Sequence, residues 1–388
     1  MGGEKYMKEP KLRFKADDGS DFPDWEEKKL GDMFSISAGG DIDKNNSSKE
    51  KSCSYPYPVY ANALMNDGLY GYANYFKVDG DTFTVTGRGD VGYAVARHCK
   101  YVPIVRLLVC RPKENDNVDF FAEQVNCARI FIESTGVPQL TAPQLAVIKL
   151  LRPSLPEQQK IADFLSTIDT IIEKQRAMVS AWEERKKGVM QKLFSQEVRF
   201  KADDGSDFPD WEEKRLGDMV EFINGRAYKQ DELLASGKYI VLRVGNLFTN
   251  DSYYYSDLEL DEDKYIEDGN LIYAWSATFG PKIYHGDKCI YHYHIWKLKF
   301  DENAISKMFL NYYLQHDVEK IKSKRTGGTM VHITKNAMEH RELEFPSLPE
   351  QQKIADCLSA LDTVIQKQKE TLEKWQELKK GLLQQMFV

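Results

Sequence analysis

RFKADDGSDFPDWEEKKLGDM, at residues 13–33, returns at residues 199–219 as RFKADDGSDFPDWEEKRLGDM with one Lys-to-Arg change. A second pair of matches closes each copy, PSLPEQQKIADFLSTIDTIIEKQ from Pro153 and PSLPEQQKIADCLSALDTVIQKQ from Pro346. The roughly 120 residues between the matched segments share no obvious identity. A repeated frame around unlike inserts predicts an internal pseudo-twofold scaffold that presents two different surfaces to one elongated, approximately symmetric partner.

Composition is that of a soluble globular protein with two or three domains. The chain has 388 residues, 42% hydrophobic and 29% charged, and no apolar run long enough to span a bilayer. Its first fifteen residues, MGGEKYMKEPKLRFK, lack the apolar core of a signal peptide. The six cysteines form no CxxC pair, which favours reduced thiols and a cytoplasmic location.

The charge balance argues against a protein that wraps nucleic acid nonspecifically on its own. Net charge is −7, and the inserts carry 13 basic against 12 acidic residues in 34–152 and 16 against 19 in 221–345. Any DNA contact must therefore use local basic patches, or partner subunits must supply much of the charge that neutralises phosphates.

Each copy ends in a segment with the spacing of a coiled coil. Apolar residues alternate at intervals of four and three, with a Gln and a Lys at the interrupting steps, Gln175 and Lys186 in one copy and Gln368 and Lys379 in the other. Each predicted helix is about 38 residues and roughly 55 Å long. The alternative is a generic dimerisation coil. Duplication within one chain favours pairing of the two helices, and we expect them antiparallel because that order keeps the two inserts apart.

Both inserts are rich in aromatic and β-branched segments separated by Gly, Asn and Asp turns, and each continues into one helix. We therefore expect related folds. The predicted class is α+β, with two β-rich domains separated by two long helices in an antiparallel coiled coil. The predicted segments are a first frame (1–33), domain 1 (34–152), a central helix (153–198), a second frame (199–220), domain 2 (221–345) and a C-terminal helix (346–388).

Signatures of catalysis are missing. The sequence has no GxGxxG after a strand, no phosphate-binding GxxxxGK[ST], no HExxH and no GxSxG. PDWEEK, at Pro23 and Pro209, has nuclease-like residue types, but its acidic residues lie within six consecutive positions instead of converging from separate strands. We expect no enzyme activity from this chain.

The densest group of metal-ligand residue types is His285, Cys289, His292 and His294. The competing interpretation is an aromatic-rich strand, YHYHIW, which has no counterpart in the first insert. We favour the strand and predict no metal site.

Polar and basic loops in the inserts are candidates for reading DNA, because Arg, Lys, Asn, Gln, Ser and Thr contact base edges and phosphates. Each loop taken singly is also typical of a solvated turn. The candidate DNA-binding residues are Lys44, Asn45, Asn46, Lys49, Arg88, Arg97, Arg226, Tyr228, Lys229, Arg243, Asn246, Ser276, Thr278, Lys324, Arg325, Thr326, Thr329 and His332.

Taken together, these segments resemble the specificity subunits of type I restriction-modification systems. The resemblance rests on the two frames, the helix starts LPEQQKIA, the helix ends KKGVMQKLF and KKGLLQQMF, and insert segments such as PVYANA, RGDVGYA and GRAYKQDEL. It covers the chain from about Lys11 onward. The first insert has SAGGDIDKN where the second has GRAYKQDEL, so no clear equivalent of that segment is expected there.

The resemblance implies a non-catalytic reader of double-stranded DNA. Each insert would read one half of a bipartite, asymmetric site, and the helices would set the spacer. Two modification subunits would dock on the frames and bring S-adenosylmethionine, so no cofactor is expected on this chain. Restriction subunits would add translocation and cleavage, and no membrane is involved.

Two rival interpretations come from other classes. A stand-alone enzyme acting on DNA would be active without partners, but the sequence lacks methyl-donor and nuclease motifs. A structural adaptor would join proteins through its coil and show no DNA sequence preference.

Overall fold

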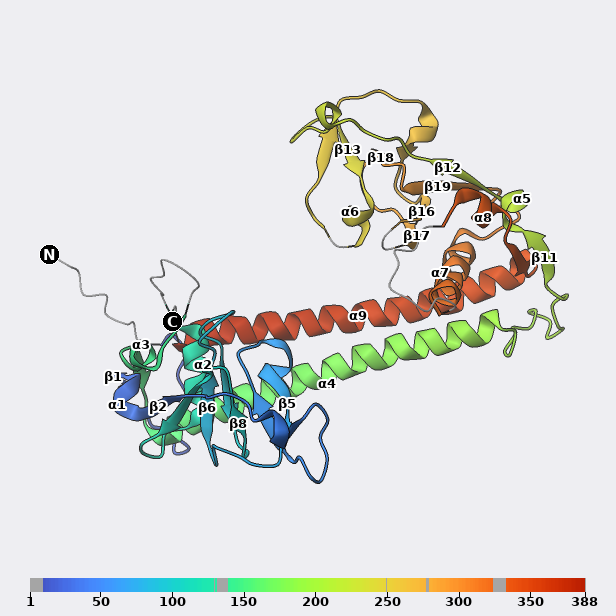
Figure 1. Ribbon diagram of the computed structural model, residues 1–388. Coiled ribbons are helices and arrows are strands. Elements are labelled where there is room, and N and C mark those ends of the chain that lie inside the picture. Colours follow the sequence, from blue (N-terminus) through green and yellow to red (C-terminus); the bar gives the residue numbers. More distant parts are fainter. Residues whose placement is uncertain are drawn as a thin grey trace. The chain divides into compact units, whose positions relative to one another are not determined.

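The computed structural model describes residues 10–128, 130, 139–248, 250–276, 279–323 and 333–387. The chain forms two compact units, the first of Met1–Arg176 and Glu370–Val388 and the second of Ala177–Lys369 (Figure 1). The division passes through both long helices, so each unit contains the first half of one helix and the second half of the other. None of the described helices is both long and apolar enough to cross a membrane.

The first unit holds two four-stranded sheets and a two-stranded frame ribbon, with strand orders β2-β9-β6-β7, β3-β5-β4-β8 and β1-β10. Its elements before the long helix are β1 (Glu26–Lys29), α1 (Leu30–Met33), β2 (Phe34–Ala38), η1 (Lys44–Asn46), β3 (Ser47–Ser48), β4 (Tyr57–Tyr60), η2 (Met65–Gly68), β5 (Leu69–Ala73), β6 (Thr82–Val85), β7 (Ala94–Arg97), β8 (Val102–Pro103), β9 (Leu108–Pro112), α2 (Val118–Cys127), α3 (Ala142–Ala146) and β10 (Lys149–Arg152).

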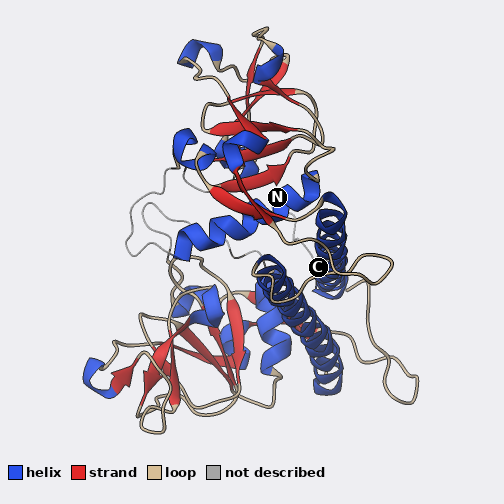
Figure 2. Ribbon diagram, turned by 90° about the vertical axis from the view of Figure 1, so that its right-hand side faces the viewer, coloured by secondary structure: helices blue, strands red, loops and turns tan. Residues whose placement is uncertain are grey.

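The second unit repeats this plan with sheets β12-β19-β16-β17 and β14-β13-β18-β15 and the ribbon β11-β20. Its elements are β11 (Glu212–Arg215), α5 (Leu216–Met219), β12 (Val220–Asn224), η3 (Gln230–Glu232), β13 (Tyr239–Leu242), α6 (Val244–Phe248), β14 (Tyr254–Ser256), η4 (Glu262–Lys264), β15 (Tyr265–Ile266), β16 (Leu271–Ala274), β17 (Gly280–Ile283), β18 (Cys289–Tyr291), β19 (Ile295–Phe300), α7 (Lys307–Ser323), α8 (Lys335–Glu339) and β20 (Glu342–Phe345). The expectation that the inserts share a fold is confirmed. Figure 2 shows the strands of each unit gathered in one β-rich body.

The long helices are α4 (Leu155–Phe194) and α9 (Leu348–Phe387), each of 40 residues and about 60 Å long. In the second unit Lys186 pairs with Asp362 at 2.6 Å and Lys369 pairs with Glu183 at 2.6 Å, so the helices run antiparallel. In the first unit Lys379 pairs with Asp169 at 2.8 Å in the same sense. The predicted antiparallel packing is confirmed within each unit.

The two lysines that interrupt the apolar seam explain its register. Lys186 and Lys379 occupy matching positions of the repeat, and each pairs with the matching aspartate of the other helix. Their remaining contacts differ, because Lys379 also bonds Glu123 at 2.7 Å whereas Lys186 lies over the Tyr312 ring. A one-turn shift of either helix would leave these partly buried charges unpaired, so the lysines specify one alignment.

The repeated frame is held to its helix by a buried carboxylate. Glu157, fully buried at the start of α4, accepts bonds from Arg13 Nε (3.0 Å) and Nη2 (2.9 Å) and from the Trp25 indole (3.0 Å). In the second unit Glu350, also fully buried, accepts from Arg199 (3.1 and 2.8 Å) and Trp211 (3.2 Å). The PEQQ motif and the RFK and PDW segments thus form one structural element, which accounts for their being repeated together.

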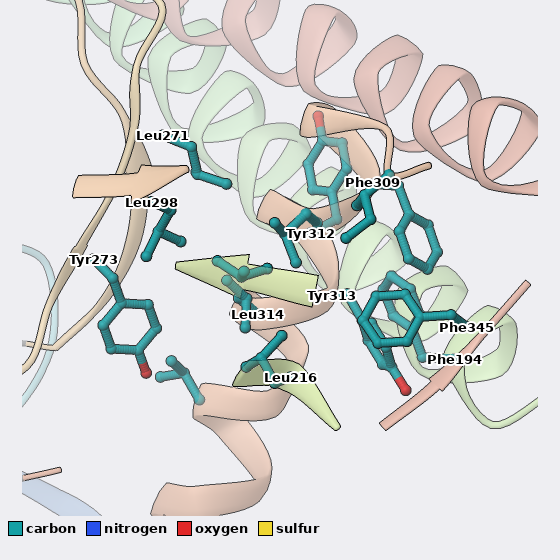
Figure 3. Packing of buried hydrophobic residues seen from close by; sticks show 14 of the residues in the cluster. Phe194, Leu216, Leu271, Tyr273, Leu298, Phe309, Tyr312, Tyr313, Leu314 and Phe345 are labelled. Atoms are coloured by element: carbon teal, nitrogen blue, oxygen red, sulfur yellow. The ribbon is translucent and has the colours of Figure 1, made fainter. Parts of the chain in front are cut away.

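The ends of the helices complete the cores of the units. In the second unit Phe194, at the end of α4, stacks on Tyr313 with ring centroids 4.9 Å apart and lies beside Phe345 (Figure 3). In the first unit Phe387, at the end of α9, packs edge-on against Phe120 at 5.3 Å. Each domain core therefore requires the second half of the helix that begins in the other copy of the repeat.

Candidate nucleic-acid interface

Four loops of the second unit, far apart in the sequence, are hydrogen-bonded to one another around the turn at residues 292–295. The bonds run from Arg226 N to Tyr291 O (3.0 Å), Tyr293 N to Arg226 O (3.1 Å), His292 N to Leu242 O (2.9 Å) and Trp275 N to His294 O (3.1 Å). The segments that carry the predicted residues Arg226, Arg243 and Ser276 therefore lie together. Ser276 itself is buried.

Arg226 is held by a carboxylate of its own loop. Its guanidinium makes two bonds to Glu232, at 3.1 and 2.7 Å, and lies 5.3 Å from the Tyr228 ring centroid. The pair raises the pKa of Arg226 and lowers that of Glu232. Glu232 therefore holds the Arg226 side chain in place before any DNA is bound, and a DNA group that contacts Arg226 must share it with Glu232. Lys229, in the same loop, is exposed.

Arg243 and Asn246 hold a neighbouring loop and remain partly exposed. The Asn246 amide accepts from Arg243 N at 3.1 Å and donates to Ser252 O at 2.8 Å. The Arg243 guanidinium lies over the Tyr254 ring, 4.2 Å from its centroid. Its Nη2 also donates to Ser252 O at 3.4 Å and its Nε is buried, so only the remaining part of the guanidinium is available to read or neutralise DNA.

The histidine-rich segment is an aromatic turn. His292 stacks against Tyr228, and His294 meets Trp275 edge-on with ring centroids 4.8 Å apart. Burial, with His294 and Arg243 nearby, lowers the pKa of His292 to about 4, so its ring is neutral near pH 7. Cys289 is fully buried, and burial raises the pKa of its thiol to about 11. Across the described ranges, no three His, Cys, Asp or Glu side chains are grouped to hold a metal ion.

In the first unit the predicted residues Lys44, Asn45 and Asn46 form the short helix η1. Asp43 caps it, accepting from Asn45 N at 3.0 Å and from Asn46 Nδ2 at 2.8 Å. These bonds lower the pKa of Asp43. Lys49 lies over the Tyr70 ring, 3.7 Å from its centroid. These residues form a polar, exposed corner of the domain.

Arg88 and Arg97 have very different surroundings. Arg97 is buried over the Tyr60 ring, 3.7 Å from its centroid, and donates to Thr84 Oγ1 at 3.2 Å. Burial lowers the pKa of its guanidinium. Arg88 is exposed and lies opposite Gln139 in a β-bridge. The structure therefore places Arg97 among groups that hold the domain together and Arg88 on its surface.

Six predicted residues lie outside the described part of the chain. They are Thr278, Lys324, Arg325, Thr326, Thr329 and His332. Their roles stay predictions.

The GRAYKQDEL segment has a backbone counterpart in the first insert, contrary to expectation. Gly39 N donates to Leu107 O at 2.8 Å as Gly225 N donates to Ile295 O at 3.2 Å, and both segments continue into a short 3₁₀ helix. A Cβ on Gly39 would lie 2.7 Å from Pro103 O, and one on Gly225 would lie 2.4 Å from Tyr291 O. The two segments share few residues, so their sequences do not reveal the match. The glycine at the same place in both, Gly39 and Gly225, is the one sequence feature that could have indicated it.

Comparison with known proteins gives one consistent family. The model described as "Type I restriction modification DNA specificity domain" matches residues 23–179 and 209–374. The MjaVIII type I restriction enzyme specificity subunit of Methanocaldococcus jannaschii is 28% identical over 266 residues, which are 62% of each chain. The putative MjaX specificity subunit of the same organism is 25% identical over 405 residues, 93% of each chain.

The alignment thus spans less than two thirds of the MjaVIII subunit and nearly all of the MjaX subunit. Among solved structures, the S subunit of a type I restriction-modification system from M. genitalium matches with a TM-score of 0.59 at 17% identity, covering 98% of this chain and 99% of that one. That likeness supports the fold described above.

Proposed function

This chain belongs to the family of type I restriction-modification DNA specificity domains, and we propose that it is the non-catalytic DNA-reading subunit of such a system. Each β-rich unit reads one half of a bipartite site. The observation that carries the proposal is the pairing of one scaffold with two different sets of loop side chains. Because the scaffold positions are equivalent and the side chains are not, the target is asymmetric.

The repeated frame supports two copies of one partner. The acidic residues of its ADDGSDFPDWEE segment are exposed in both units, and the Glu157 and Glu350 clamps hold both copies alike. One partner surface therefore fits both frames, which favours two modification subunits per chain. Those subunits supply S-adenosylmethionine and the methyl transfer, and restriction subunits supply translocation and cleavage.

The test is to co-express the chain with its modification subunit and to map methylated adenines across a genome by single-molecule sequencing. The expected result is a bipartite motif with a fixed spacer, modified on both strands. A stable complex that methylates no defined motif would contradict DNA reading and favour an adaptor. Methylation or cleavage by the chain alone would contradict the non-catalytic role.

A further inference from the structure

We infer that residues 104–107 and 292–295 are a matched pair of specificity-determining turns, each reading bases in the half-site of its own unit. The inference rests on the proposed function and names where that function is carried out. None of the four residues of either turn is among the DNA-binding candidates predicted from the sequence, where His292 and His294 stand only in the histidine-rich group. We refer to them as the first and second reading turns.

The two turns occupy the same place in their units. The first joins β8 to β9 and the second joins β18 to β19. Four backbone bonds correspond one to one. In the first turn they run from Ile104 N to Tyr60 O, Val105 N to Gly40 O, Leu107 N to Ile104 O and Gly39 N to Leu107 O. In the second turn, in the same order, they run from His292 N to Leu242 O, Tyr293 N to Arg226 O, Ile295 N to His292 O and Gly225 N to Ile295 O. These bonds hold both turns at the same place in their units, whereas the central residues differ in backbone conformation, because φ is positive at Val105 and Arg106 and not at Tyr293 and His294.

A fifth contact is matched in position but not in residue. The Val105 carbonyl accepts from Asn62 Nδ2 at 2.6 Å, and the Tyr293 carbonyl accepts from the Trp275 indole at 2.8 Å. Asn62 and Trp275 come from different loops of the shared fold. The same carbonyl is therefore satisfied by a side-chain donor in both units, which holds each turn still for recognition.

The side chains at the two central positions differ between the turns. The first turn presents Val105 and Arg106, both exposed, and the second presents Tyr293 and His294. Val105 and Arg106 have φ of 52° and 59°, a left-handed conformation that a β-branched residue rarely adopts. Such strain is retained where the position of a side chain matters, as it does in a recognition loop.

This chemistry predicts what each turn reads. A guanidinium on a rigid turn binds the O6 and N7 atoms of guanine in two parallel bonds. The second turn offers aromatic rings and no guanidinium, which suits a thymine methyl or an adenine edge. We therefore expect a guanine contact in the first half-site through Arg106, and recognition without guanidinium at the matching position of the second.

The experiment compares Arg106→Ala with the double variant Tyr293→Ala/His294→Ala, each co-expressed with the modification subunit and mapped for methylated adenines. Arg106→Ala should lose preference at one position of one half-site and weaken binding of the cognate duplex about tenfold or more. The double variant should relax only the other half-site. Arg111→Ala removes another exposed arginine from the same unit, at the far end of β9, and serves as the matched control.

The outcomes separate this inference from the proposed function. A wild-type complex without any motif would refute the function itself. A wild-type motif that survives unchanged in both variants would overturn only the reading turns. Uniform weakening across all sequences, with a shallower salt dependence, would also overturn base reading, because it is the behaviour of a phosphate contact. If the Arg106→Ala variant does not assemble with the modification subunit, Arg106→Lys is the substitute, because lysine keeps the charge but cannot make two parallel bonds. An unchanged methylation motif in the Arg106→Lys variant would count against the inference.

Discussion

At the residue scale, the pKa values of two histidines should be shifted in opposite directions. Burial lowers the pKa of His292 to about 4. Partial burial also lowers the pKa of His98, but bonds to Asp81 (2.8 Å) and Asp119 (3.0 Å) outweigh burial and raise it above its ordinary value. Side-chain nitrogen NMR should therefore find His292 neutral from pH 7 down to about 5 while His98 is already protonated below pH 6.5.

These shifts set the sign of two stability terms. The depressed pKa of His292 gives a contribution that is complete above about pH 6.5 and is lost as the pH falls toward 4. The raised pKa of His98 gives one that is complete below about pH 6.5 and is lost as the pH rises through the folded value. His292→Gln and His98→Gln identify the two signals. A His292 signal that titrates at pH 6.5 or higher would contradict the packing around the second reading turn.

At the scale of elements, the buried carboxylates should each stabilise their own frame. Glu157→Gln removes the charge that Arg13 and Trp25 contact. It should lower the free energy of unfolding by about 1.5–3 kcal/mol, the usual contribution of hydrogen bonds to a charged group. Hydrogen exchange should quicken in residues 13–33 and at the start of α4. Glu350→Gln should do the same in residues 199–219.

The control for both variants is Glu213→Gln, which removes an exposed carboxylate from the frame strand β11. Its exchange should match the wild type. Equal acceleration in both frames after either single change would show that the clamps are not local, and no acceleration would show that the carboxylates contribute little.

The elements also show what sequence reasoning can and cannot reach. The heptads predicted α4 and α9, because long periodic segments carry redundant signals. The antiparallel direction was predicted from the insert that precedes each helix. The composition of YHYHIW predicts an aromatic strand across residues 291–296. Its outer residues do lie in β18 and β19, but His292–His294 form the turn between them. Arg97 is predicted to contact DNA because it is basic, and only the fold shows that it is buried. Contacts between loops distant in sequence carried no local signal.

At the scale of the whole molecule, the helices should act as a ruler. Seven added residues keep the apolar seam in register, and in a helix they add about 10 Å, or about three base pairs of DNA. We propose inserting one heptad after Arg176 and one after Lys369, where each helix passes from one unit to the other. The methylated motif should keep both half-sites and gain about three base pairs of spacer.

The double insertion changes the length of the helices without changing the residues proposed to read DNA, because both reading turns and both frames are untouched. A heptad placed in α4 alone serves as the control. It shifts Lys186 away from Asp362 and the end of α4 out of its core, so the single insertion should prevent assembly and leave no motif. An unchanged spacer with both heptads present would mean that the DNA or the modification subunits set the distance. In that case the repeat would duplicate docking surfaces without measuring the site.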